Sequence, residues 1–307
     1  MTAAPEVKAG EVKVSAAQYP IGQPTTLAVW EQKIALWVKE GAASGAKLLV
    51  FPEYAAIEQA AAFGPEVYGD LKATLSKIAE LADSRVALHA ELARKYKVHI
   101  VVGSGPVRRA DGAFVNAAQI VTPAGKIGVQ DKLVMTPFER GWGISAGAAV
   151  RIFRTELATL GIAICYDCEF PLLVHAMAQA GADIVLVPSC TERVSGYHRV
   201  RTGCLARALE NTIAMVQSPT VGDAPWSPAV DFNAGAAGIY VPSEHGISDD
   251  GVLAQGTQDA AQWVTATIDL DRLRRVRESG EMRNAHDWDL QPGAPAAHVP
   301  VEIIDLR

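Results

Sequence analysis

The sequence contains no long hydrophobic run. Apolar segments such as residues 47–51 and 184–187 have the length of a β-strand, far below the ~20 residues that a helix needs to span a bilayer. Residues 1–13 contain no apolar stretch of the signal-peptide type. We therefore expect a soluble, cytoplasmic protein that does not bind membranes.

Cysteine and positive charge are also scarce. Four cysteines among 307 residues are too few for a disulfide scaffold. Lysine and arginine number 28 against 34 aspartates and glutamates, which gives a net charge of −6. A mildly acidic surface has no general attraction for the phosphates of nucleic acids or for anionic lipid. We therefore expect a small-molecule ligand and no nucleic-acid partner.

The residues that are abundant indicate an α/β protein with a large core. Hydrophobic residues make up 49% of the chain and charged residues 20%, which is typical of a globular domain. Strand-like and helix-like hydrophobic patterns alternate along the first two thirds of the chain. We predict strands at 12–18, 48–51, 98–103, 114–122, 151–155, 160–165 and 183–188, and helices at 26–43, 68–96, 172–181 and 196–211. Further short strands are predicted near 212–217, 236–241, 252–254 and 263–268, followed by a helix at 271–278.

No linker or internal repeat divides the chain. We predict a flexible N-terminus over residues 1–11 and a single domain over residues 12–280. Residues 281–307 form a C-terminal extension in this prediction. Its segment 291–300 is rich in proline and alanine, so we expect an extended arm that could serve at an interface.

Three short motifs place reactive side chains near the ends of predicted strands. Glu53 ends Phe-Pro-Glu, and Cys165 lies in Gly-Ile-Ala-Ile-Cys-Tyr-Asp. Lys132 follows Asp131, after a less distinct strand pattern at 126–130. In α/β sheets, ligands bind at the carboxyl ends of strands. A thiol with a pKa near 8.5 needs a base or a cation to react at neutral pH. Glu53 could accept and return that proton, while Lys132 could stabilise a thiolate or an oxyanion.

Each motif alone has a simpler interpretation. A glutamate after a strand is usually a solvated turn residue, and a lone buried cysteine usually acts as a small hydrophobe. Cys165 and Cys168 form a Cys-x-x-Cys pair that would suit redox chemistry or zinc, but no second pair follows. The histidines show no metal-ligand spacing. We therefore expect no metal ion and no cofactor.

Taken together and in this order, the motifs resemble the nitrilase superfamily of carbon–nitrogen hydrolases. The resemblance covers about residues 12–270 and includes Phe170-Pro171, Val187-Pro-Ser189 and the segment 207–211. It implies a four-layer αββα sandwich and a catalytic triad of Glu53, Lys132 and Cys165. It also implies that Glu139 is a second glutamate that orients Lys132, and that the chain forms a homodimer or a larger homo-oligomer.

The residues around the cysteine favour an amidase-type branch of that superfamily. Tyr166-Asp167 follows Cys165, where true nitrilases tend to carry Trp-Glu. We therefore expect a cysteine amidohydrolase that cleaves a small linear amide through a thioester and releases ammonia or an amine. The alternatives are a nitrilase or an acyl-transferring relative with the same triad, and a non-catalytic binding member of the fold.

Further residues are candidates for contact with the substrate. The backbone N–H of Tyr166, directly after the nucleophile, is a natural second oxyanion donor. Tyr54, Trp142, Cys190 and Thr191 are candidates for the pocket wall. Asp167 and Glu169 near the cysteine hint at a neutral or cationic substrate, unless both pair with nearby arginines or backbone groups.

Overall fold

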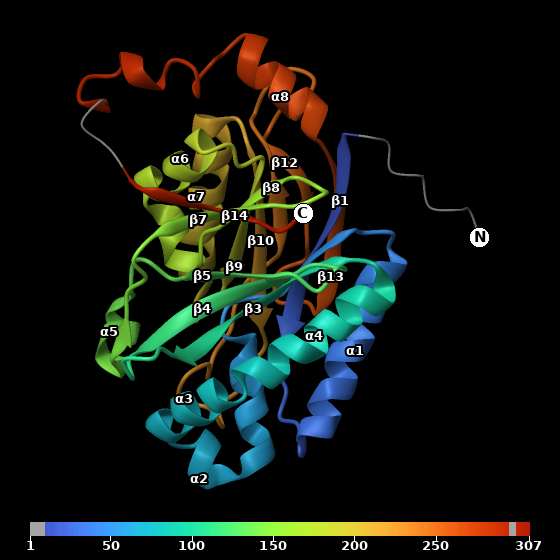
Figure 1. Ribbon diagram of the computed structural model, residues 1–307, viewed down its shortest axis with the longest axis vertical. Helices are drawn as coiled ribbons and strands as arrows, with labels where there is room; N and C mark the ends of the chain where they lie inside the picture. Colours follow the sequence, from blue (N-terminus) through green and yellow to red (C-terminus); the bar gives the residue numbers. More distant parts are fainter. Residues whose placement is uncertain (1–9, 295–298) are drawn as a thin grey trace.

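The computed structural model describes residues 10–294 and 299–307. Most of the predicted flexible N-terminus and part of the predicted arm at 291–300 therefore lie outside the described residues. Glu11, the last residue of that predicted N-terminus, already belongs to the first strand. Two β-sheets stack face to face and helices cover both outer faces (Figure 1). This arrangement confirms the predicted αββα sandwich.

The first sheet carries the N-terminal half of the chain. Its strands run in the order β13, β1, β2, β3, β4 and β5. Strands β1, β2 and β3 are parallel, whereas β13, β4 and β5 are antiparallel to their neighbours. The bounds are β1 Glu11–Pro20, β2 Leu48–Val50, β3 His99–Arg108, β4 Phe114–Val121, β5 Ile127–Asp131 and β13 Gln262–Asp269, with the short β6 Ile144–Ser145 beside β4.

The second sheet carries the other seven strands of the described residues. Its order is β14, β7, β8, β9, β10, β11 and β12. The bounds are β7 Val150–Arg154, β8 Thr159–Ile162, β9 Ile184–Ser189, β10 Ala214–Val221, β11 Gly238–Tyr240, β12 Val252–Gln255 and β14 Val301–Asp305. The two sheets are joined where the end of β1 pairs with the end of β10, at Tyr19–Thr220 and Pro20–Val221.

Alternating side chains of β1 and β2 divide the hydrophobic core into two parts. Val14 and Val50 point between the sheets and share a buried cluster with Met215 of β10. Ala17 and Leu49, at odd-numbered positions of the same strands, point the other way and pack under the helices. This period-2 pattern is expected when both faces of a sheet are buried.

The helices cover the outer faces and connect the strands. Helices α1 Leu27–Ala43, α2 Pro65–Tyr68, α3 Leu71–Glu80 and α4 Ala82–Tyr96 lie on the side of the first sheet, and α6 Pro171–Gln179 and α7 Val194–Asn211 on the side of the second. The remaining helical elements are α5 Pro137–Trp142, α8 Leu270–Ser279 and the 3₁₀ segments η1 Ala55–Phe63, η2 Cys165–Glu169 and η3 Trp288–Leu290. No helix within the described ranges is long and apolar enough to cross a membrane.

The prediction of one long helix over residues 68–96 is wrong. The chain breaks at Leu81, between α3 and α4. The buried guanidinium of Arg85 donates to the carbonyl of Ile78 at 3.3 Å, an acceptor that a continuous helix would offer to the N–H four residues later. The same guanidinium bonds Gln59 at 2.8 Å. This tertiary contact accounts for the break, which the hydrophobic stripe does not reveal.

The C-terminal extension ends in a strand that the sequence analysis did not predict. Strand β14 pairs in parallel with β7 from Val301–Val150 to Asp305–Arg154. Leu306 follows the strand and is only 3% exposed within the core between the sheets. The last residues therefore belong to the folded body of this chain.

Candidate active site

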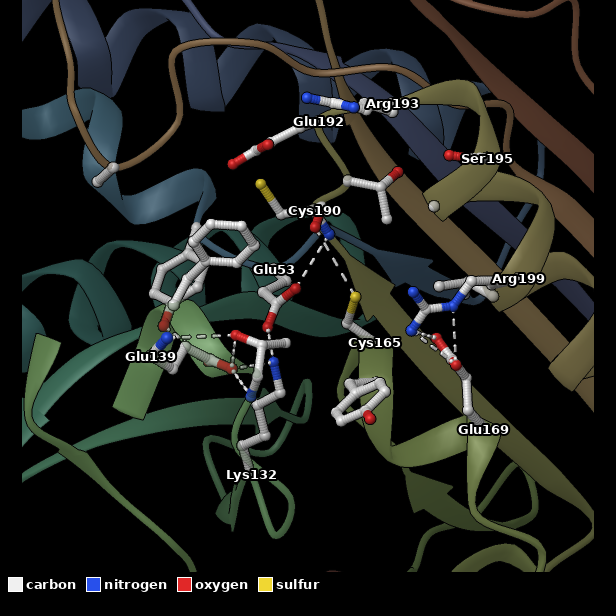
Figure 2. A pocket seen from close by; sticks show the side chains of 18 of the residues that line it. Glu53, Lys132, Glu139, Cys165, Glu169, Cys190, Glu192, Arg193, Ser195 and Arg199 are labelled. Carbon is white, nitrogen blue, oxygen red and sulfur yellow. Dashed lines mark hydrogen bonds and ion pairs between the residues drawn. The ribbon is translucent and has the colours of Figure 1, made fainter. Parts of the chain in front are cut away.

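The structure brings Glu53, Lys132 and Cys165 to one cavity. Glu53 lies three residues after β2, Lys132 directly after β5, and Cys165 three residues after β8. The cavity has a volume of about 470 Å³, and all three residues line it. Strands from both sheets thus deliver the predicted triad to the same place (Figure 2).

Lys132 lies between two glutamates. Its Nζ donates to Oε1 of Glu53 and to Oε2 of Glu139, both at 2.7 Å, and all three side chains are at most 3% exposed. Burial alone would lower the pKa of Lys132, but the two carboxylates outweigh burial and raise that pKa. Lys132 is therefore a permanent cation in the cavity. Glu139 lies where the resemblance implied, in contact with Lys132.

The two glutamates have different electrostatic environments. Burial raises the pKa of Glu53 above its ordinary value despite the charge of Lys132, and Glu139 raises it further. Burial alone would also raise the pKa of Glu139. The charge of Lys132 and the hydrogen bonds from Thr136 and Asn116 outweigh burial and lower that pKa. Glu139 is thus the fixed anion, and Glu53 is the carboxylate better suited to exchange a proton.

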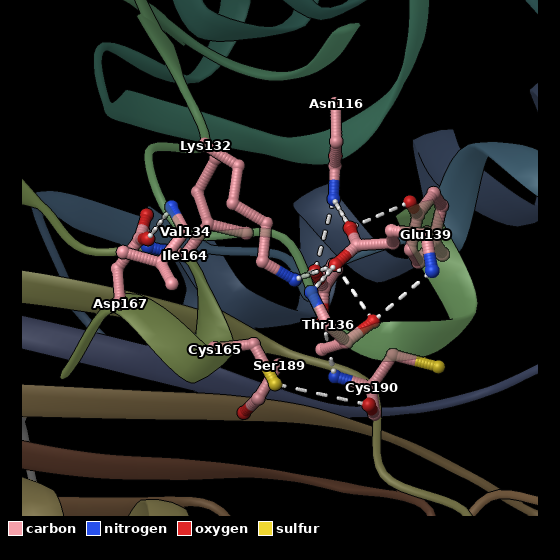
Figure 3. A network of polar contacts seen from close by, with 12 residues as sticks. Asn116, Lys132, Val134, Thr136, Glu139, Ile164, Cys165, Asp167, Ser189 and Cys190 are labelled. Carbon is pink, nitrogen blue, oxygen red and sulfur yellow. Dashed lines mark hydrogen bonds and ion pairs between the residues drawn. The ribbon is translucent and has the colours of Figure 1, made fainter. Parts of the chain in front are cut away.

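Asn116 and Thr136 hold the two glutamates, and the sequence analysis missed both (Figure 3). The Asn116 amide donates to Oε1 of Glu53 at 2.9 Å and to Oε1 of Glu139 at 3.0 Å. Thr136 caps helix α5 and donates from Oγ1 to Oε2 of Glu139 at 2.9 Å. An asparagine inside the buried strand β4 is unusual, because strands are depleted in asparagine. This unusual position in the sequence was the one signal that could have pointed to a special role for Asn116.

Cys165 lies on a strained turn that projects its side chain into the cavity. Its φ of 48° is in the left-handed region, which is uncommon for a residue with a Cβ. The Sγ atom faces the backbone carbonyl of Cys190 at 3.8 Å. Burial raises the pKa of the Cys165 thiol well above its usual range, and the charge of Glu53 adds to this while Lys132 opposes it. The side chain is therefore a thiol at neutral pH and needs a base to become a nucleophile.

Asp167 connects the loop of Lys132 to the loop of Cys165. Its carboxylate is 1% exposed and accepts N–H groups of Leu133 at 3.2 Å, Val134 at 2.8 Å and Ile164 at 3.3 Å. Leu133 and Val134 directly follow Lys132, and Ile164 directly precedes Cys165. Asp167 therefore faces backbone groups, and Glu169 pairs with Arg199. Neither is a free anion that would favour a cationic substrate.

All four predicted wall residues line the cavity, as does Tyr166. Tyr54 donates its hydroxyl to Oε1 of Glu139 at 2.8 Å, and its ring packs edge-on against Trp142 with centroids 5.7 Å apart. The N–H of Cys190 donates to Oε2 of Glu53 at 3.0 Å. Thr191 donates its hydroxyl to the carbonyl of Ala234 at 2.7 Å. The role of the Tyr166 N–H as an oxyanion donor stays a prediction.

Two further cysteines lie near Cys165. Burial raises the pKa of Cys190 in the cavity wall to about 12, and its Sγ donates to Oδ1 of Asn233 at 3.4 Å. Cys168 is fully buried and its Sγ contacts the carbonyl of Val200 at 3.7 Å. In the part of the chain that the structure describes, no group of three or more histidine, cysteine or acidic side chains is arranged to hold a metal ion.

Comparison with known proteins identifies the family to which the chain belongs. The family model for carbon-nitrogen hydrolase matches residues 13–278. The chain is 35% identical over 277 residues to the probable hydrolase YhcX of Bacillus subtilis, covering 90% of this chain but only 53% of that relative. It is 30% identical over 209 residues to an (R)-stereoselective amidase of a Pseudomonas species, covering 67% of this chain and 70% of that protein.

The solved structure of an amidase from Nesterenkonia sp. superposes with a TM-score of 0.69 at 19% identity, covering 94% of this chain and all of the other. A variant of that amidase carries the acetamide moiety of fluoroacetamide, added covalently at its active-site cysteine. At this identity the likeness shows the fold. The family match covers most of the sequence, and the chain therefore belongs to the carbon–nitrogen hydrolase family, within the nitrilase superfamily.

Proposed function

We propose that this protein is a cysteine-dependent amidohydrolase that cleaves a small linear amide and releases ammonia or an amine and a carboxylic acid. One observation carries the proposal: a buried lysine is held between two glutamates beside a thiol that faces the same cavity. This set supplies a nucleophile, a base and a fixed positive charge within one cavity.

In the first half-reaction, Sγ of Cys165 forms a bond to the amide carbonyl carbon as Glu53 takes the thiol proton. Both pKa shifts support this pairing, because burial keeps Cys165 protonated and raises the proton affinity of Glu53. Lys132 stabilises the oxyanion of the tetrahedral intermediate. Glu53 then returns its proton to the departing amine, the carbon–nitrogen bond breaks, and a thioester remains.

In the second half-reaction, water attacks the thioester carbonyl. Glu53 takes a proton from the water, and Lys132 again stabilises the oxyanion. The carbon–sulfur bond breaks, the proton goes to the Cys165 sulfur, and the carboxylic acid leaves. The acyl group is held covalently, so these steps need no organic cofactor.

Amide rather than nitrile chemistry is supported by the residues after the nucleophile. Tyr166-Asp167 follows Cys165, whereas the relatives include both proteins named as amidases and proteins named as nitrilases. Because the chain spans about half of its Bacillus relative, the substrate of the whole protein is part of this proposal.

The test is ammonia release from a panel of small primary amides and the matching nitriles. We expect the wild-type protein to release ammonia from amides and the Cys165→Ala variant to lose at least about 1,000-fold in rate. Cys204→Ala is the matched control, because Cys204 lies on the buried face of α7 and does not line the cavity. Turnover of nitriles alone, or full activity in Cys165→Ala, would overturn the proposal.

A further inference from the structure

The backbone of Cys190 contacts both the base and the nucleophile. Cys190 directly follows strand β9 of the second sheet. Its N–H donates to Oε2 of Glu53 at 3.0 Å, and its carbonyl oxygen accepts the thiol of Cys165 at 3.8 Å (Figure 2). Lys132 and Asn116 bond the other oxygen of Glu53, Oε1. The N–H of Cys190 is therefore the donor that orients Oε2.

The side chain of Cys190 has a different partner from its backbone. Figure 2 shows its sulfur pointing away from the sulfur of Cys165. The Sγ atom donates to Oδ1 of Asn233 at 3.4 Å. Burial raises the pKa of Cys190 to about 12, so the thiol keeps at neutral pH the hydrogen that it donates. A cysteine in a wall is usually a small apolar filler, whereas this one is hydrogen-bonded.

Asn233 is itself held on its other side. It is 5% exposed, and its Nδ2 donates to the carbonyls of Gly222 at 2.9 Å and Val230 at 2.8 Å. These two bonds use both hydrogens of Nδ2, which leaves Oδ1 as the acceptor for the thiol. The N–H of Gly222 also donates to the backbone oxygen of Asn233 at 3.1 Å. Asn233 thus closes the neck of a loop over residues 222–233, whose Ala229 lines the cavity.

The next residue along, Thr191, is fastened to the same segment. The N–H of Ala234 donates to the Thr191 carbonyl at 2.8 Å, and the Thr191 hydroxyl donates to the Ala234 carbonyl at 2.7 Å. Residues 190–191 and 233–234 therefore lie side by side. Of these contacts, the thiol bond to Asn233 is the one made by the residue whose N–H holds Glu53.

We propose that Cys190 and Asn233 are positioning residues: the bond between their side chains fixes the backbone of Cys190, which holds the Glu53 carboxylate and the Cys165 thiol. This inference rests on the proposed function, since it assumes that Glu53 is the base for Cys165. The base follows β2 and the nucleophile follows β8, so their relative position depends on contacts between the two sheets. A small displacement of either group slows the reaction. Neither positioning side chain takes part in the bond changes.

The experiment measures the rate at which iodoacetamide alkylates Cys165, which requires no amide hydrolysis. The Cys165 sulfur forms a bond to the methylene carbon, iodide leaves, and Glu53 takes the thiol proton. The rate is followed at pH 8 by mass spectrometry with fragmentation that separates Cys165 from the other cysteines. The variants are Cys190→Ala, Cys190→Ser and Asn233→Ala, and the first is repeated in a Glu53→Gln background.

We expect Cys190→Ala to slow alkylation about threefold to fivefold, because an ordinary hydrogen bond corresponds to about fivefold and a thiol is a weaker donor. Asn233→Ala should slow it at least as much. Cys190→Ser keeps a donor for Asn233 and should restore the rate to within about twofold of the wild type. In the Glu53→Gln background the effect of Cys190→Ala should shrink below about twofold, since the base that the backbone orients is gone.

Ser227→Ala is the matched control. Ser227 lies in the same loop, is 1% exposed, and its Oγ accepts the N–H of Ala229 at 3.4 Å, so its loss should leave the alkylation rate unchanged. A wild-type rate in Cys190→Ala overturns the inference. So does equal slowing in the serine and alanine variants, or an undiminished effect in the Glu53→Gln background, because a purely structural role predicts these results.

The result is separable from the proposed function. If amides are not hydrolysed but alkylation slows as expected, the positioning residues stand and the amidohydrolase proposal fails. If amides are hydrolysed and alkylation does not slow, only the positioning inference fails.

Discussion

At the scale of single residues, the charges around Cys165 decide how the thiol is activated. The sequence left two routes open, a thiolate held by Lys132 or a thiol deprotonated by Glu53. Lys132 is already bonded to two carboxylates, and burial raises the pKa of Cys165. The proposed mechanism therefore uses the base route, in which Lys132 serves mainly the oxyanion.

Asp167 gives a prediction for pH dependence. Burial raises its pKa from 3.8 to about 7, although Lys132 and backbone N–H groups act in the opposite direction. Above about pH 7 the carboxylate accepts the N–H groups of both catalytic loops. Below about pH 7 a proton occupies one acceptor position, so the loops loosen. We expect kcat/KM for amide hydrolysis to fall as pH drops below about 7.

The Asp167→Asn variant tests this assignment. An amide keeps the size of the side chain but presents N–H donors to backbone N–H groups, so we expect about a tenfold loss of kcat/KM at pH 8, or ~1.4 kcal/mol. The acid limb near pH 7 should disappear in this variant, while any limb from Glu53 remains. A pH profile with the wild-type limb intact would contradict the role of Asp167.

The triad could be predicted from sequence because each member lies in a short motif at a strand end. The sequence gives only weak signals for Asn116 and for the backbone partners of Asp167, because Glu53 lies 63 residues from Asn116 and Val134 lies 33 residues from Asp167. The first contact depends on strand pairing within the first sheet, and the second on the stacking of the two sheets.

At the scale of elements, helix α5 positions Glu139 through its N-terminal cap. Thr136 Oγ1 accepts the N–H of Glu139 at 3.2 Å, and the N–H of Thr136 donates to Oε2 of Glu139 at 2.9 Å. This reciprocal capping box fixes the glutamate that contacts Lys132. Thr136 therefore both stabilises the start of α5 and positions Glu139.

Replacing the cap should affect stability and activity. We expect Thr136→Ala to lower the free energy of unfolding by about 1 kcal/mol, the usual cost of losing an N-cap, and to lower kcat because Glu139 loses a donor. Thr136→Ser keeps the hydroxyl and should retain most of both properties. Urea unfolding and ammonia release measure the two effects. Equal values for the alanine and serine variants would argue against the cap.

Hydrophobic spacing predicted α1 well and α3–α4 poorly, for a physical reason. The stripe of Trp30, Ile34 and Val38 faces the sheet along one straight helix. The stripe over residues 68–96 is just as periodic, but the buried Arg85 takes the carbonyl of Ile78. A side chain that bonds a helix carbonyl leaves no trace in the spacing of apolar residues.

At the scale of the whole molecule, the C-terminal strand completes the second sheet. Strand β14 lies beside β7 (Figure 1), and the backbone N–H of Leu306 donates to the carbonyl of Arg154 at 2.8 Å. The polar and proline-rich approach to this strand concealed it in the sequence. Its pairing with β7, about 150 residues earlier, depends on the folded sheet.

We expect Leu306→Ala to destabilise the protein by about 2–3 kcal/mol, because a buried leucine leaves both a transfer cost and a cavity. Ile303→Ala, in the adjoining strand β14, is the matched control, since Ile303 is 48% exposed. Its cost should stay below about 1 kcal/mol. Urea unfolding measures both, and equal costs would contradict the placement of Leu306 in the core.

The most direct test of the central claim is the intact-protein mass during turnover of a small amide, stopped with acid, in the wild type and in Cys165→Ala. The account predicts an adduct with the mass of the acyl group in the wild type alone, together with ammonia release that the variant lacks. Amide turnover that persists in Cys165→Ala, or an equal adduct on that variant, would contradict it.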